Sequence, residues 1–96
     1  MPNKQEAILI DLIRHFPDMR RYDVEQRLHS VSFALKLPLS NGATWGLTND
    51  TFLAKYEGWW QATIQDRTAG YLTYKHDRSL AVAICKVWLA WKELQS

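Results

Sequence analysis

The chain has 96 residues, a formal net charge of +2, 47% hydrophobic residues, 23% charged residues and one cysteine. This length predicts one domain over residues 1–96 with a single core, and the composition excludes a disordered chain. One cysteine excludes an internal disulfide, and no apolar run is long enough for a signal peptide or a membrane span, so we expect a cytoplasmic protein without membrane contact.

The first half of the chain predicts two helices. The first covers about residues 4–15, where five apolar residues share one helical face before the stop signal Pro17: Ile8, Leu9, Leu12, Ile13 and Phe16. The second follows a cap at Asp18 or Asp23 and has apolar residues at helical spacing: Val24, Leu28, Val31 and Leu35. Residues 31–37 also alternate between apolar and other side chains, which leaves a strand over these residues as the alternative.

The middle of the chain is rich in turn-forming residues. We expect a loop over residues 39–49, with Trp45 either packed under the first helix or lying on a contact surface. Asp50 is placed to cap one or two helical turns over residues 51–57, and Gly58 is placed to end them.

The last third predicts a tryptophan-bearing hairpin and a long helix. The hairpin covers about residues 59–75, and strand alternation puts Trp60 on one face and Trp59 on the other. The final helix covers about residues 78–94, and its wide apolar half, which includes Trp88 and Trp91, is expected to face the sheet as core.

Together these elements predict an α+β domain. Two N-terminal helices precede a small antiparallel sheet, and the C-terminal helix packs across that sheet. A third strand over residues 31–37 would stabilise the sheet, because a lone hairpin is only marginally stable. Val82 and Leu89 form a second apolar seam on the final helix, which either an N-terminal helix covers or a second chain docks on.

One resemblance rests on this last third. A tryptophan-bearing strand, a short turn, a second strand and the apolar helix from Ser79 to Ala90 follow one another within residues 58–94. This order resembles small phage and prophage proteins of the ABA-sandwich-like kind. The resemblance implies an origin in a phage or other mobile element, the cytoplasm of a host cell as the location, and a helix packed on a sheet, but it implies no site residues.

The sequence contains no recognisable catalytic, metal or phosphate-binding constellation. His76 and Asp77 are adjacent, which is typical of a turn or helix cap, because catalytic pairs are usually assembled from separate segments. Cys85 lies in the middle of an apolar helix, which predicts a buried thiol. The three histidines lack metal-ligand spacing, so we expect no metal, no cofactor and no enzymatic activity.

Two functions are then weighed. The favoured one is a non-enzymatic protein-binding module that covers a host or phage protein, for example as an anti-CRISPR-like inhibitor of a host defence complex. The same module could also form a homodimer in which the C-terminal helices of two copies contact each other. The expected contact residues are Trp45, Trp59, Val82 and Leu89. The alternative is a small nucleic-acid-binding regulator, in which phosphates would contact Arg20, Arg21 and Arg27.

Overall fold

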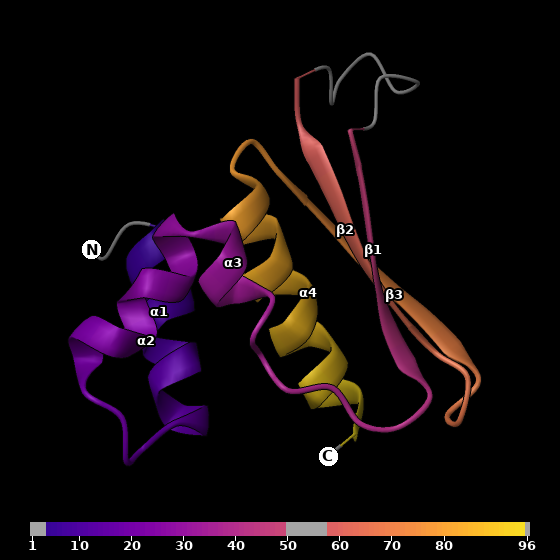
Figure 1. The fold of residues 1–96 in the computed structure, drawn as a ribbon, viewed down its shortest axis with the longest axis horizontal. Coiled ribbons are helices and arrows are strands. Elements are labelled where there is room, and N and C mark those ends of the chain that lie inside the picture. Colours follow the sequence, from indigo (N-terminus) through magenta and orange to yellow (C-terminus); the bar gives the residue numbers. More distant parts are fainter. Residues whose placement is uncertain (1–3, 50–57, 96) are drawn as a thin grey trace.

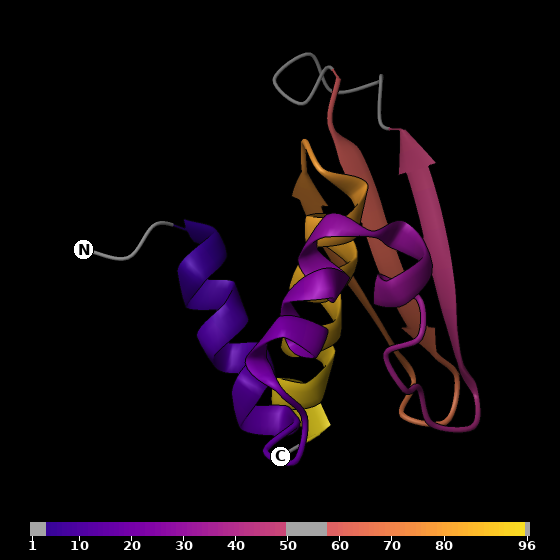
Figure 2. The same cartoon turned by 60° about the vertical axis from the view of Figure 1, so that its left-hand side comes forward.

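The computed structural model describes residues 4–49 and 58–95, and these residues have an α+β fold. The elements are α1 Lys4–His15, α2 Arg21–His29, α3 Val31–Ala34, β1 Ala43–Asn49, β2 Trp60–Asp66, β3 Tyr71–Asp77 and α4 Leu80–Gln95. The strands form an antiparallel sheet in the order β1-β2-β3. Helix α4 packs across one face of the sheet, and α1, α2 and α3 contact α4 from its other side (Figure 1, Figure 2). The predicted fold class, with a C-terminal helix over an antiparallel sheet, is confirmed.

Helix α4 is apolar on most sides because it lies between two layers. Its buried residues are Ala81, Val82, Ala83, Ile84, Cys85, Val87, Trp88 and Trp91. The thiol of Cys85 donates a hydrogen bond to the carbonyl oxygen of Arg27 in α2, over 3.2 Å, so this side of α4 faces the N-terminal helices. Val82 lies one turn earlier on the same side and is 1% exposed. Of the two expectations for the Val82/Leu89 seam, cover by the N-terminal helices is the one that the structure shows.

The alternation of side chains in the sheet follows from the register of β2 with its two neighbours. Ala62 and Ile64 of β2 are buried and face α4. Trp45 of β1 and Thr73 of β3 lie opposite Ile64, and Lys75 of β3 lies opposite Ala62, so all three belong to the same face. The intervening residues face away from α4.

The third strand is β1, and two expectations about it are wrong. Residues 31–37 are not a strand, because Val31–Ala34 form α3, in which the Ser30 hydroxyl accepts a hydrogen bond from the amide of Phe33. The segment predicted as a loop over 39–49 instead contains β1. In β1, Gly46 lies against Thr63, whose hydroxyl donates to the Gly46 carbonyl over 3.2 Å and would collide with any Cβ at position 46.

The second predicted helix is split at Ser30 into α2 and α3, and the expected cap at Asp18 or Asp23 is wrong, because Arg20 is the N-cap of α2 and makes no side-chain cap hydrogen bond. The remaining boundaries agree closely with the sequence. The first predicted helix, residues 4–15, is α1, and the predicted hairpin over about 59–75 is β2 and β3. The final helix begins at Leu80, where the Ser79 hydroxyl accepts from the amide of Val82 over 3.3 Å. The helical turns expected over residues 51–57 lie outside the described residues.

Both tryptophans of α4 belong to the core, as predicted, and their indole N–H groups are hydrogen-bonded. Trp88 donates to the Pro38 carbonyl over 2.8 Å, and Trp91 donates to Oδ2 of Asp66 over 2.9 Å. Asp66 is only 3% exposed, and its Oδ1 accepts from the amide of Ala69 over 2.9 Å. The Ala69 amide and the Trp91 indole hold the pKa of Asp66 below its usual range, because both bonds favour the carboxylate. This carboxylate therefore fixes the β2–β3 turn to the C-terminal half of α4.

Candidate interaction surface

His76 and Asp77 have separate structural partners. The His76 ring nitrogen Nε2 lies 2.9 Å from Oε1 of Gln61, on the face of the sheet away from α4. Asp77 accepts from the Ser79 amide over 3.0 Å and lies 3.4 Å from the Lys86 ammonium group. Asp77 thus helps to start α4, and the two side chains do not form a base with an orienting carboxylate.

Cys85 is fully buried, and burial raises the pKa of its thiol to about 12. We expect iodoacetamide to alkylate Cys85 at pH 8 at least roughly a hundredfold more slowly in the folded protein than in urea, because the thiolate is the reactive form. Mass spectrometry of the alkylated protein over time measures both rates. Equal rates would contradict a buried, unreactive thiol.

The three arginines of the nucleic-acid hypothesis are each engaged with a neighbouring group. Arg20 lies 3.1 Å from Asp23, and Arg21 lies 2.8 Å from Glu6, which raises the pKa of the arginine. Arg27 donates to the Asp23 carbonyl, and its guanidinium group lies 5.1 Å from the centre of the Phe16 ring. The acidic partners interrupt the positive charge, so these side chains do not form a continuous basic stripe for phosphates.

The four expected contact residues do not form one surface. Trp45 is half-buried on the α4 side of β1. Trp59 directly precedes β2, and the Arg78 guanidinium group lies 5.7 Å from the centre of its ring. Val82 is core, so the expectation that it contacts a partner is corrected: the N-terminal helices cover it. Leu89 is half-buried and lines a surface hollow. Of the two seam residues, Val82 and Leu89, a partner can therefore contact only Leu89.

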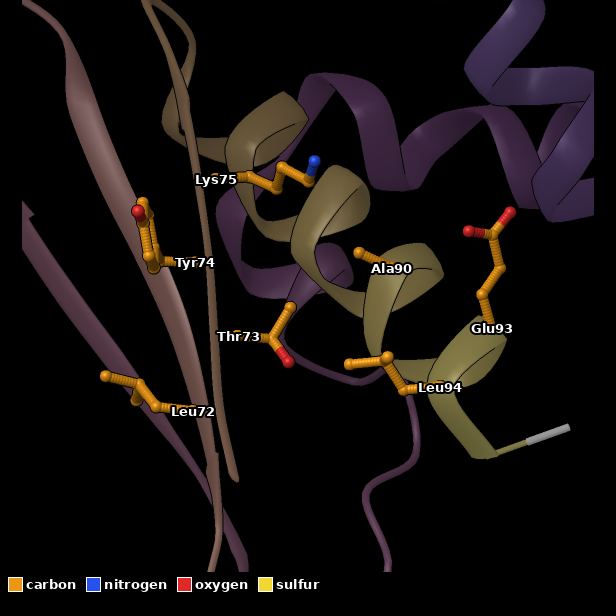
Figure 3. Close-up of a pocket in the computed structure, with 7 residues that line it drawn as sticks. All are labelled: Leu72, Thr73, Tyr74, Lys75, Ala90, Glu93 and Leu94. Atoms are coloured by element: carbon orange, nitrogen blue, oxygen red, sulfur yellow. The ribbon is translucent and has the colours of Figure 1, made fainter. Parts of the chain in front are cut away.

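A larger hollow lies beside β3, and we call it the β3 groove. It has a volume of about 550 Å³. Its walls come from β3 and from the last turns of α4 (Figure 3): Leu72, Thr73, Tyr74, Lys75, Ala90, Glu93 and Leu94. The hollow that Leu89 lines adjoins this groove, because both share Lys75, Ala90 and Glu93, and it extends to Ile8 and Asp11 of α1. The two hollows therefore lie next to each other.

The β3 groove carries exposed apolar side chains. Leu72 is 60% exposed, Tyr74 is 58% exposed and Leu94 is 59% exposed. Figure 3 shows Leu72 and Tyr74 on the side of β3 that faces away from α4, whereas Thr73 and Lys75 lie on the α4 side. The groove therefore follows the edge of β3 and reaches both faces of the strand.

Sequence reasoning did not identify the residues of this groove. Leu72 and Tyr74 alternate with Thr73 and Lys75, so the sequence contains the signal for a strand with one apolar row. Which row faces α4 depends on the register with β2, and the exposure of that row depends on β3 lying at the end of the sheet. Both facts require the folded arrangement.

Two further features of the described residues bear on function. They contain no group of three histidine, cysteine, aspartate or glutamate side chains that is arranged to hold a metal ion. Within residues 4–49 and 58–95, no helix has the length and apolar character of a transmembrane span. Comparisons of the chain with protein-family models, with curated proteins and with solved structures found no significant match.

Proposed function

We propose that the chain is a non-enzymatic protein-binding module and that the β3 groove is its contact surface. One observation carries this proposal. Among the described residues, four large apolar side chains are more than half exposed, and three of them line the same groove: Leu72, Tyr74 and Leu94. Scattered exposed apolar residues are ordinary, but a cluster in a hollow is typical of a protein interaction site.

The character of the groove supports a protein partner. Exposed apolar and aromatic side chains lie beside charged ones, Lys75 and Glu93, which matches an apolar centre with a polar rim. An aromatic anchor such as Tyr74 is a frequent source of binding energy in such surfaces. Covering a partner through this groove would also be sufficient for an inhibitor of a host defence complex, because such an inhibitor needs no active site.

The proposal is tested with a displayed library of protein fragments from bacterial and phage genomes. Fragments selected on the immobilised wild-type protein are measured against the double variant Leu72→Gln and Leu94→Gln. We expect at least about a tenfold loss of affinity, because two apolar contacts are removed from the centre of the groove.

Tyr22→Gln is the matched control, because Tyr22 is 67% exposed on α2, away from the groove. It should bind the selected fragments like the wild type, and circular dichroism should show that all variants are folded. Fragments that bind the double variant and the wild type equally well, or a selection that yields no fragment, would refute the groove as the contact surface.

A further inference from the structure

The open edge of β3 can form hydrogen bonds that the sheet does not use. β3 is the last strand of the sheet and pairs with β2 on one side, and no described residue pairs with its other side. In a strand, every second residue turns its N–H and C=O groups toward one edge. A seven-residue edge strand therefore offers a row of backbone donors and acceptors to a neighbouring chain, although the His76 carbonyl already accepts from the Lys86 ammonium group over 2.6 Å.

The shape of the β3 groove matches a strand placed along this edge. Four consecutive residues of β3, Leu72 to Lys75, line it, although consecutive strand side chains point to opposite faces. A ligand that lay on one face alone would contact every second residue. A strand beside β3 would contact all four, with one set of its side chains over Ala90 and Leu94 and the other set near Leu72 and Tyr74.

The other edge of the sheet lacks these features. β1 has no large apolar residue that is exposed, because Trp45 and Leu47 are half-buried on the α4 side and the intervening residues are Thr44, Gly46 and Thr48. Main-chain pairing at β1 would gain no apolar contact comparable with those at Leu72 and Tyr74. The two edges are therefore unequal, and β3 is the one suited to bind a peptide.

The charged side chain nearest to an added strand is that of Lys75, because it belongs to β3 itself, whereas the other charged residue of the groove, Glu93, belongs to α4. Lys75 lies on the α4 side of the groove and makes no ion pair with any described residue. An acidic side chain in a neighbouring strand would pair with it across the strands. In a symmetric antiparallel dimer centred on Tyr74, the two copies of Lys75 would instead be diagonal neighbours on one face, where like charges repel.

We infer that the β3 groove binds an extended, acidic segment of a partner protein, which adds to β3 as a fourth strand. This inference rests on the proposed function and specifies the partner of the same groove. Affinity would come from main-chain hydrogen bonds along the edge. Preference for sequence would come from an apolar side chain over Ala90 and Leu94 and an acidic side chain at Lys75.

Backbone methylation of a bound peptide tests strand addition directly. Random peptides of about twelve residues, long enough to span the edge strand, are displayed on phage and selected on the immobilised full chain, and the synthetic peptides are measured by isothermal titration calorimetry. Each backbone amide is then N-methylated in turn. Because only alternate amides of an added strand face β3, methylation should weaken binding about tenfold or more at every second position and about twofold or less between them.

Lys75→Gln should weaken the binding of acid-bearing peptides by about two- to fivefold, the usual range for one cross-strand charge pair. Lys36→Gln should leave it unchanged, because Lys36 follows α3 and lines a different hollow. If peptides require Leu72 and Leu94 but show no alternating methylation pattern, strand addition is wrong and the proposed function stands. If peptide binding does not depend on these two leucines, or no peptide is selected, both proposals fail. If the chain instead dimerises through β3 in sedimentation experiments and takes up no peptide, the occupant is a second copy and the inference is overturned.

Discussion

Replacing Val82 with aspartate is expected to unfold the domain. Val82 is 1% exposed on the side of α4 that faces the N-terminal helices, and Cys85 on the same side is hydrogen-bonded to α2. An unpaired carboxylate in that position would cost several kcal/mol, since the cluster around it is apolar. A domain of this size has about 5–15 kcal/mol of stability in total, so most of it would be lost.

Circular dichroism and tryptophan fluorescence during urea titration measure this effect. Leu94→Asp is the matched control on the same helix, because Leu94 is 59% exposed, and its stability should change by about 0.5 kcal/mol or less. If the Val82→Asp protein were folded but no longer bound its partner, Val82 would be a contact residue, as the sequence analysis expected, and the expected unfolding would be wrong.

The elements that the sequence predicted well are those with one dominant period. In α1, Ile8, Leu9, Leu12 and Ile13 fall on one helical face and Pro17 follows, so the helical period dominates although Ile10 is 39% exposed. The helix over 78–94 and the hairpin over 59–75 have comparably simple patterns. These patterns are local, and the energy of burying an apolar face favours the same structure as the local backbone preference.

The third strand could not be placed because its signals compete. Residues 31–37 alternate like a strand, but the Ser30 cap and the packing of Ala34 in the core favour a helix there. The sequence predicted a loop at β1 because Gly46 and the turn at 40–42 are typical of loops. They outweighed the strand-like alternation of the apolar residues Ala43, Trp45 and Leu47. Its pairing with β2 joins segments that residues 50–59 separate, and such a nonlocal contact has no marker in a single sequence.

The candidate site was missed for a related reason. The sequence drew attention to tryptophans, but the described structure uses Trp88 and Trp91 as core and half-buries Trp45 and Trp59. The exposed cluster instead depends on which strand ends the sheet. The position of β3 at the edge of the sheet is set by the strand order. This position exposes its alternating side chains, which therefore line the groove.

Replacing Trp91 with alanine is expected to lower the free energy of unfolding by about 3–5 kcal/mol, the usual cost of truncating a buried aromatic side chain. The change removes a side chain that is 1% exposed and leaves a cavity beneath the sheet. Trp91→Phe separates packing from hydrogen bonding, because the ring is largely retained while Oδ2 of Asp66 loses its donor. This variant should cost about 1–3 kcal/mol, the usual penalty for leaving a buried polar atom unpaired.

Asp66→Asn should also destabilise the domain, and the effect should depend on pH. The Ala69 amide and the Trp91 indole lower the pKa of Asp66 in the folded chain, so the wild-type carboxylate contributes stability above its ordinary pKa. This contribution is lost as the pH falls below about 4 and through the lowered pKa, since the acid must then be protonated. The amide that replaces the carboxyl group in the variant does not titrate in this range.

Urea titrations of the wild type and Asp66→Asn between about pH 7 and pH 2 measure the difference in unfolding free energy across this titration. The difference should be largest at neutral pH and should shrink as the pH falls, because protonation deprives the wild type of the same charged acceptor. Combining Asp66→Asn with Trp91→Phe should cost less than the sum of the two single changes, since both remove one shared hydrogen bond. A pH-independent difference, together with additive single effects, would show that the buried carboxylate does not anchor α4 to the β2–β3 turn.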